Sequence, residues 1–199
     1  MALDVTALRH GVSAIAARLE TEHEMLTAID GKVGDGDLGI TLLKAFRELD
    51  KIKADLPDDL GQALMQMAAA VNKVSSSSFG TLLATSLMTV AKQTRGTTSA
   101  PWSALPGYME SAIETMSARG RANLGDKTVL DALSGAAKAA QGQGEPQAML
   151  LAARRGVDEA LDAFRDKPNQ IGRARIFAER TIGLDDPGMF ALKVMVDAL

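Results

Sequence analysis

The sequence contains no cysteine among its 199 residues. Disulfide bridges, thiolate metal sites and cysteine nucleophiles are therefore excluded. Aromatic residues are also scarce, at 4%, and the longest apolar runs, such as residues 148–153, are far shorter than the roughly 20 residues that a membrane-spanning helix needs. The amino terminus lacks the basic segment followed by an apolar one that marks a secretory signal. We therefore expect a soluble, cytoplasmic protein that is not embedded in a membrane.

The charge of the chain is nearly balanced. Its formal net charge is −3, with acidic and basic residues interleaved, whereas nucleic-acid-binding domains usually carry a basic patch. Apolar residues make up 46% and charged residues 24%, as in ordinary globular proteins. A chain of this length can bury a real core. We expect one domain spanning residues 1–199 and no nucleic-acid partner.

Apolar residues recur three or four positions apart through most of the chain, which is the spacing of an amphipathic helix. Proline in a helix interior costs about 3 kcal/mol, and all six prolines fall between these stretches or at their starts. Short connections favour antiparallel neighbours. We predict an all-α protein, a bundle or barrel of about eight antiparallel amphipathic helices. The stretches are 5–30, 42–49, 60–71, 82–92, 108–116, 128–140 and 149–164.

The segment Asp30–Asp37 (DGKVGDGD) places three carboxylates and three glycines within eight residues. Carboxylates about 4 Å apart repel by roughly 1 to 4 kcal/mol per pair, so a fold tends to accept them only around a cation. Hard oxygen ligands beside a phosphate suit Mg²⁺, and a helix beginning near Leu38 would attract phosphate to its N-terminus. A surface turn with an aspartate cap explains the same residues equally well. An EF-hand is excluded, because apolar residues follow where its last ligands should lie.

Three further segments allow two interpretations each. Ser75–Ser78 is either a polar loop with one capping serine or a cradle for phosphate oxygens. Gly125–Thr128 is not a P-loop, because Asp126 interrupts the required Gly-Lys-Thr order; we expect a helix start with Asp126 near the cap. Asp186-Pro187 reads as another helix entry, with proline at the first helical position. The histidines, His10 and His23, are expected at the surface rather than in catalysis.

These segments together resemble the L subunit, or L domain, of dihydroxyacetone kinases. Four pieces occur in the family's order, and the resemblance covers nearly the whole chain. They are Leu26–Asp37 (LTAIDGKVGDGD), the serine run, Arg119–Asp131 (RGRANLGDKTVLD), and the stretch from Gly172-Arg173-Ala174 through Glu179–Gly183 (ERTIG) to Asp186-Pro187-Gly188.

The resemblance implies a barrel of eight antiparallel amphipathic helices that binds ATP or ADP. By match, Asp30, Asp35 and Asp37 hold two Mg²⁺ ions that bridge the nucleotide phosphates, and Arg173 acts with them by fixing the phosphates. The remaining nucleotide positions are, by match, Leu38, Gly39, Ile40 and Thr41 at the phosphates, Ser77 and Ser78 in a second phosphate loop, Gly120 and Val129 near adenine and ribose, and Asp186 and Pro187 with Arg173.

The resemblance also implies partners. The ketone substrate of such kinases is held on a histidine of a separate K-type subunit, and in some members a phosphotransferase-system protein rephosphorylates the bound ADP. A homodimer is one alternative for the oligomeric state. The sequence departs from the family at Leu38, where histidine is usual, and at the serine run with Phe79, where glycines are usual. These departures are compatible with a subgroup that acts on another ketose or sugar, or with reduced activity. The rival interpretation is a nucleotide-sensing module that contacts a regulator or partner enzyme without transferring phosphate.

Overall fold

The computed structural model describes residues 2–75 and 77–199. Ser76, part of the serine run, lies outside these residues, as does Met1. The described chain is all-α, as predicted, with two-residue strands β1 (Leu3–Asp4) and β2 (Ser99–Ala100) that pair antiparallel. Its eight α-helices are α1 (Val5–Val33), α2 (Leu38–Ile52), α3 (Leu60–Val74), α4 (Ser78–Gln93), α5 (Leu105–Gly120), α6 (Val129–Ala140), α7 (Pro146–Arg165) and α8 (Pro187–Asp197). Short 3-10 helices occupy Lys53–Asp55 (η1), Trp102–Ala104 (η2) and Ala174–Thr181 (η3).

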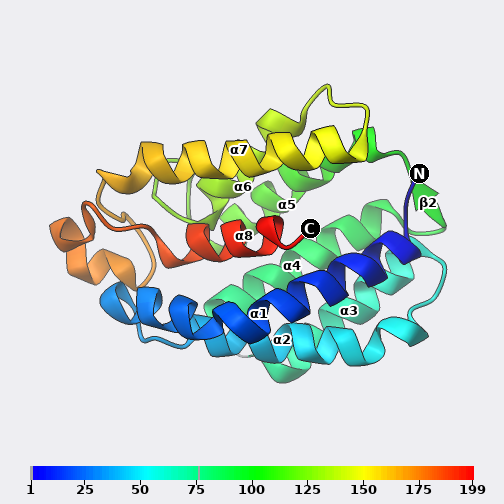
Figure 1. Cartoon of the computed structure of the whole chain (residues 1–199), viewed down its shortest axis with the longest axis horizontal. Helices are drawn as coiled ribbons and strands as arrows, with labels where there is room; N and C mark the ends of the chain where they lie inside the picture. The colour runs from blue at the N-terminus through cyan, green and yellow to red at the C-terminus, as the bar shows by residue number, and fades with distance from the viewer. Residues whose placement is uncertain (1, 76) are drawn as a thin grey trace.

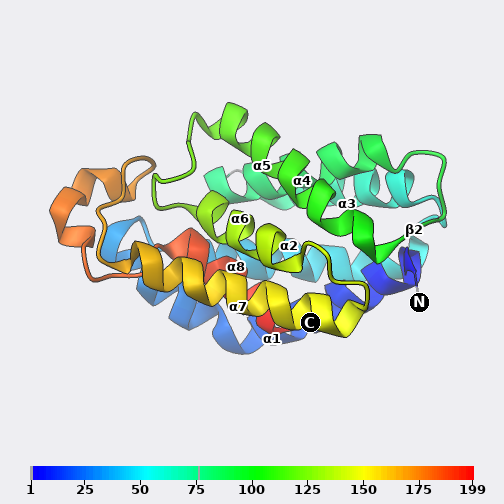
Figure 2. The same ribbon diagram turned by 90° about the horizontal axis from the view of Figure 1, so that it is seen from above.

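The helices form a closed ring. Each helix packs against the next one along the chain, and α8 packs against α1, so that the ring has no open edge. Short turns make consecutive helices antiparallel, as Figures 1 and 2 show. The predicted barrel is therefore confirmed. No helix of the described chain is long and apolar enough to cross a bilayer.

Apolar faces of the helices meet inside the ring. One large cluster joins α1, α2, α3, α4 and α8, and smaller clusters lie between α6, α7 and α8 and between α5 and α6. Several close approaches between helices leave no room for a side chain larger than that of glycine. A Cβ at Gly39 would lie 2.0 Å from the His23 carbonyl oxygen of α1, and a Cβ at Gly135 would lie 2.3 Å from the Gly156 carbonyl oxygen of α7.

The up-and-down order gathers four connections at one end of the barrel, which we call the site end. These connections are 34–37, 75–77, 121–128 and 166–186. They contain most of the segments that carry the family resemblance. At this end helix C-termini, which attract cations, alternate with helix N-termini, which attract anions. The longest of these connections contains η3, drawn in orange, which projects from the site end in both views (Figures 1 and 2).

Candidate functional site

A cluster of three carboxylates lies at the site end. Asp30, Asp35 and Asp37 each offer one oxygen, and these oxygens lie within 4.8 Å of one another. Asp30 is buried, Asp37 is half-buried and Asp35 is exposed. The predicted loop is shorter than expected, because α1 continues to Val33 and Asp30 stands on its last turns. A helix therefore fixes one carboxylate, while the turn after it presents the other two.

Glycines and one backbone bond shape this turn. Gly36 has φ +73, a left-handed conformation that glycine adopts without strain. A Cβ at Gly34 would lie 2.2 Å from Oδ1 of Asp30, so the carboxylate occupies the space of the missing side chain. The Leu38 N–H donates to Oδ2 of Asp30 over 3.2 Å. The turn thus holds the Asp30 carboxylate in one orientation.

The first turn of α2 offers its backbone to the site. The side chain of Asp37, the N-cap residue, forms no capping hydrogen bond with α2. Asp30 accepts the Leu38 N–H, and the next N–H groups of the first turn are directed toward the same end of the helix. Leu38, Gly39 and Thr41 are buried, and Ile40 is exposed. Leu38 belongs to the main apolar cluster and therefore contributes to core packing at the start of α2.

Arg173 lies 138 positions after Asp35 in the sequence, and the fold brings it to the carboxylate cluster. Its guanidinium forms an ion pair with Asp35, and both side chains are partly exposed. The guanidinium is always charged and matches carboxylate or phosphate oxygens in geometry. The site end thus places the Arg173 guanidinium, a group that can also bind phosphate, beside the three carboxylates.

The serine run is divided between two roles. Ser77 caps α4, because its hydroxyl accepts a hydrogen bond from the Gly80 N–H at 3.1 Å, and it lies 3.3 Å from the Ser75 hydroxyl. A Cβ at Gly80 would lie 2.0 Å from the Ser75 hydroxyl. Ser78 is exposed and faces a cavity. Capping thus explains Ser77, while Ser78 is available to a ligand.

A cavity of about 440 Å³ opens beside Ser78 between α4, α5 and α6. Its wall includes Gly120 and Val129, which are the residues predicted near the base and ribose, and Gly172, the neighbour of Arg173. This volume falls within the range of small-molecule sites. The Gly172-Arg173 pair therefore connects the cavity to the carboxylate cluster.

Helix α6 starts after the turn at residues 125–128, with Asp126 near its cap, as predicted. The cap itself is Thr128, two residues after Asp126: it forms a capping box with Asp131, whose carboxylate accepts the Thr128 N–H at 2.9 Å. Threonine followed three residues later by an acid is the stronger sequence signature of a helix start. Asp126 instead accepts the Asn123 N–H within the turn.

Asp186 and Pro187 begin α8 as predicted. Asp186 caps the helix by accepting the Met189 N–H at 2.9 Å, and it also accepts from the Asn169 side chain at 2.8 Å. Burial raises the pKa of Asp186 to about 6, although these hydrogen bonds and the charge of Lys127 oppose the shift. Its side chain lies outside the three-carboxylate cluster. A Cβ at the following Gly188 would lie 3.4 Å from Val129 of the cavity wall.

Lys127 was not predicted as important, yet it is fully buried. A lysine in a polar turn normally lies at the surface, and no feature of local spacing distinguishes it.

The two histidines lie at or near the surface, as predicted. His10 is exposed, and half-buried His23 lies 3.1 Å from the Leu19 carbonyl oxygen of its own helix.

Comparisons with known proteins identify the family of the chain. The sequence profile of the DAK2 domain matches residues 32–199. The chain is 29% identical to the PEP-dependent dihydroxyacetone kinase 2, ADP-binding subunit DhaL, of Listeria innocua, over 94% of this chain and 90% of that subunit. It is 30% identical to human triokinase/FMN cyclase over 88% of this chain, but over only 31% of that protein.

A solved structure has the same fold. The dihydroxyacetone kinase from C. freundii in complex with AMP-PNP and Mg²⁺ superposes with a TM-score of 0.75 at 23% identity. The superposition covers 97% of this chain and 33% of that one. The chain thus matches about nine tenths of the length of the Listeria subunit and about a third of the length of the longer proteins.

Proposed function

The chain belongs to the DAK2 domain family, to which the L subunits of dihydroxyacetone kinases belong, and we propose that it is the Mg²⁺–nucleotide-binding subunit of a dihydroxyacetone-type kinase. It would present a phosphoryl group to a ketone held on a separate K-type subunit. A cytoplasmic location and one domain over residues 1–199 are part of this proposal. The observation that carries it is that Gly172 lines the cavity, while its neighbour Arg173 forms an ion pair with Asp35 of the carboxylate cluster.

The donor set of the cluster suits Mg²⁺. Three carboxylate oxygens within 4.8 Å of one another are too few for a calcium cage but match the pattern in which Mg²⁺ takes carboxylates, waters and substrate phosphates. Asp30, Asp35 and Asp37 would hold the metal, with two ions as in the family resemblance. When bound, Mg²⁺ would supply positive charge against the phosphate oxygens.

The cavity suits the nucleoside of ATP or ADP. Val129 and Leu130 give it an apolar wall, Gly120 and Gly172 let a planar ring approach the backbone, and Ser78 offers a hydroxyl. A nucleoside in the cavity would direct its phosphates toward Arg173 and the first turn of α2. The uncapped N–H groups of α2 and the Arg173 guanidinium would then fix those phosphates.

Phosphoryl transfer in this arrangement depends on positioning and charge. The chain's own residues would orient the terminal phosphoryl group toward the site end, where a K-type subunit could bring the ketone. His10 and His23 lie on α1, and neither belongs to the carboxylate cluster or to the wall of the cavity, so we do not assign either a covalent role. The same proposal includes two alternative sources of the phosphoryl group. Either ATP exchanges into the site, or a phosphotransferase-system protein rephosphorylates the bound ADP.

The nucleotide-sensing module is the second candidate, and the departures at Leu38 and Phe79 bear on whether transfer activity is retained. Both side chains pack into apolar clusters. The substitutions therefore alter the core beneath the site rather than its charged groups, which favours retained transfer. A chain that binds Mg²⁺–ADP but supports no transfer with any K-type subunit would favour the sensing module.

The test is calorimetric titration of ADP, with and without Mg²⁺, into the wild type and an Asp35→Ala, Asp37→Ala double variant. We expect the double variant to lose Mg²⁺-dependent binding by at least about 100-fold, since charge-assisted contacts contribute several kcal/mol together. The matched control is Asp55→Ala with Asp58→Ala, which removes the same charge at exposed positions between α2 and α3. Equal affinities for the wild type and the Asp35/Asp37 variant would refute the metal assignment.

A further inference from the structure

The connection between α7 and α8 must be held in place if Arg173 is to reach the carboxylate cluster. It spans residues 166–186 and contains only the short helix η3. Ala178 within it has φ +46, a conformation that alanine rarely adopts. Most of this segment therefore lacks the backbone hydrogen bonds of a regular helix, and other contacts must hold it in place.

Lys127 supplies the central contact. Its ammonium group donates to the carbonyl oxygens of Lys167 at 2.7 Å, Thr181 at 2.9 Å and Arg165 at 3.1 Å. A lysine ammonium has three donors, so its hydrogen-bonding capacity is fully used. Two acceptors precede Arg173 and one follows it. A single side chain therefore fastens both ends of the loop that carries Arg173.

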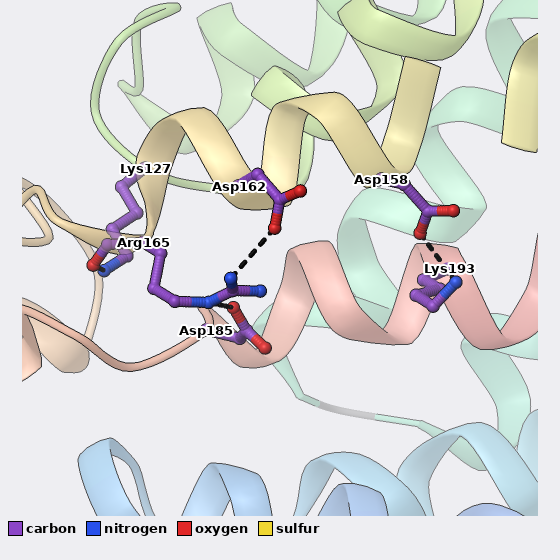
Figure 3. A network of polar contacts seen from close by, with 6 residues as sticks. All are labelled: Lys127, Asp158, Asp162, Arg165, Asp185 and Lys193. Carbon is purple, nitrogen blue, oxygen red and sulfur yellow. Dashed lines mark hydrogen bonds and ion pairs between the residues drawn. The ribbon is translucent and has the colours of Figure 1, made fainter. Parts of the chain in front are cut away.

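The surroundings of Lys127 fit an anchoring role. The residue is 1% exposed, and burial lowers the pKa of its ammonium group, while the carboxylates of Asp186, Asp185 and Asp166 oppose that shift. Two of its acceptors lie at the C-terminus of α7, where the helix dipole favours a cation. Figure 3 shows Lys127 beside the last turn of α7, next to Arg165.

A second set of bonds extends the same anchor. Asn169 donates through its side chain to the Lys127 carbonyl oxygen at 2.7 Å and to Asp186 at 2.8 Å. Its own N–H donates to the Thr181 hydroxyl at 2.9 Å. The Gln170 N–H donates to the Asp126 carbonyl oxygen at 3.0 Å. The turn before α6, which leads into the cavity wall at Val129, is thereby joined to the segment that carries Arg173.

We propose that Lys127 is a positioning residue for nucleotide binding: its three carbonyl contacts hold segment 166–183 so that Arg173 stays at the boundary between the cavity and the carboxylate cluster. This role rests on the proposed function, because it assigns Lys127 an effect on Mg²⁺–ADP through Arg173. Lys127 itself would not touch the nucleotide. Without the anchor, the segment would leave its ordered state and Arg173 would be absent from the site for part of the time.

The first experiment is hydrogen exchange of the full chain, measured by mass spectrometry on wild type and Lys127→Met. We expect at least about tenfold faster exchange in peptides covering residues 166–183, where the amides of Asn169, Gln170 and Gly183 are bonded, and unchanged exchange in α3. The matched control is Lys193→Met. Lys193 of α8 also bridges to α7, but through an ion pair with Asp158 (Figure 3), and it pairs with Asp197 within α8. Unchanged exchange in segment 166–183 of Lys127→Met would overturn the proposal.

The second experiment is a double-mutant cycle read by titration of ADP with Mg²⁺. If the segment is ordered about a tenth of the time in Lys127→Met, the apparent Kd rises about tenfold. In an Arg173→Ala background the same substitution should change the Kd less than about twofold, because the residue through which Lys127 acts is already absent. A general loss of structure would instead weaken binding equally in both backgrounds, and that result would overturn the positioning role.

Two further outcomes separate this inference from the proposed function. If the wild type binds no Mg²⁺–ADP, the proposed function fails and the positioning role fails with it, while the exchange data still show whether Lys127 anchors the segment. If Lys127→Met does not fold, Lys127→Gln is used in the same cycle, because the amide keeps a polar group but has only two donors for the three carbonyl oxygens. Binding by Lys127→Gln that is weakened equally in the wild-type and Arg173→Ala backgrounds, or not weakened at all, would then refute the positioning role.

Discussion

At the level of single residues, Asp186 lies in the buried polar network behind the cavity. Its protonation state differs between the folded and unfolded chain, so it makes stability depend on pH. Its pKa is about 6 in the folded chain, against an ordinary value of 3.8. Between these two pH values the folded chain keeps a proton that the unfolded chain has lost. The contribution of this group to stability is therefore fully present below pH about 4 and is lost as the pH rises through about 6.

We accordingly expect Asp186→Asn to become relatively more stable as the pH rises. Asparagine still caps a helix but does not ionise. Between pH 4.5 and 7, the free energy of unfolding of the variant should gain about 2 kcal/mol relative to the wild type, from about 1.4 kcal/mol per pH unit. Urea unfolding at three pH values measures this difference. Parallel curves for the two proteins would contradict the raised pKa, and Asp166→Asn, at an exposed position, is the control.

Among the structural elements, the α6–α7 crossing depends on two glycines. A Cβ at Gly135 would lie 2.3 Å from the Gly156 carbonyl oxygen, and a Cβ at Gly156 would lie 2.3 Å from the Gly135 carbonyl oxygen. These contacts are with backbone atoms, so a side-chain rotation cannot relieve them. The two helices would have to move apart.

Gly135→Ala should therefore destabilise the protein by at least about 2 kcal/mol through overpacking, although alanine is intrinsically the better helix former by about 1 kcal/mol. Gly107→Ala is the matched control, because Gly107 lies in α5 and a Cβ there meets nothing within 4 Å. That variant should be neutral or slightly stabilised. Thermal and urea unfolding measure both. A Gly135→Ala variant as stable as Gly107→Ala would mean that the crossing is looser than described.

The elements also show what the sequence could predict. Helices and their approximate limits followed from local apolar spacing, and the three aspartates lie within one short segment, so their proximity needed no tertiary information. Arg173 was assigned to the same site only by the family resemblance, because nothing in its local sequence indicates that it contacts Asp35. Lys127 was missed, since burial of a lysine depends on three carbonyl groups that lie 38 to 54 positions away.

Caps and helix ends were predicted less well than helix interiors. Asp126 and Thr128 are both good capping residues, and only the reciprocal bonds with Asp131 decide between them. The carboxylate of Asp30 stands on α1 rather than in the loop, because the helix continues through Gly31 to Val33 despite the low helix propensity of glycine. Tertiary contacts outweigh local preference at such positions.

On the scale of the whole molecule, ligand binding at the site end should stabilise the entire ring, because the cavity and the carboxylate cluster draw on residues of α1, α2, α4, α5 and α6 and the connection before α8. At a concentration of 100 times Kd, Mg²⁺–ADP should add about 2.7 kcal/mol to the free energy of unfolding. For a chain of this size that corresponds to a rise in Tm of about 5 to 10 °C.

Differential scanning calorimetry with Mg²⁺ alone, ADP alone and both together measures this rise. We expect the combination to exceed the sum of the separate effects, because the metal joins the carboxylates to the phosphates. The Asp35→Ala, Asp37→Ala variant should lose that excess. A Tm that is the same under all four conditions, including buffer alone, would indicate a helical bundle without a nucleotide site.

The closure of the ring between α1 and α8 has a consequence for how the chain folds. Most neighbours in the ring are also neighbours along the chain, so hairpins of helices can form early from local contacts. The α1–α8 seam joins helices that are far apart in the sequence, and the entropy of bringing them together favours its late formation. Until α8 docks, the apolar side chains that face it remain open to solvent and to other chains. Docking of α8 therefore completes the barrel, and a chain in which this helix has not yet docked would be the form most exposed to aggregation.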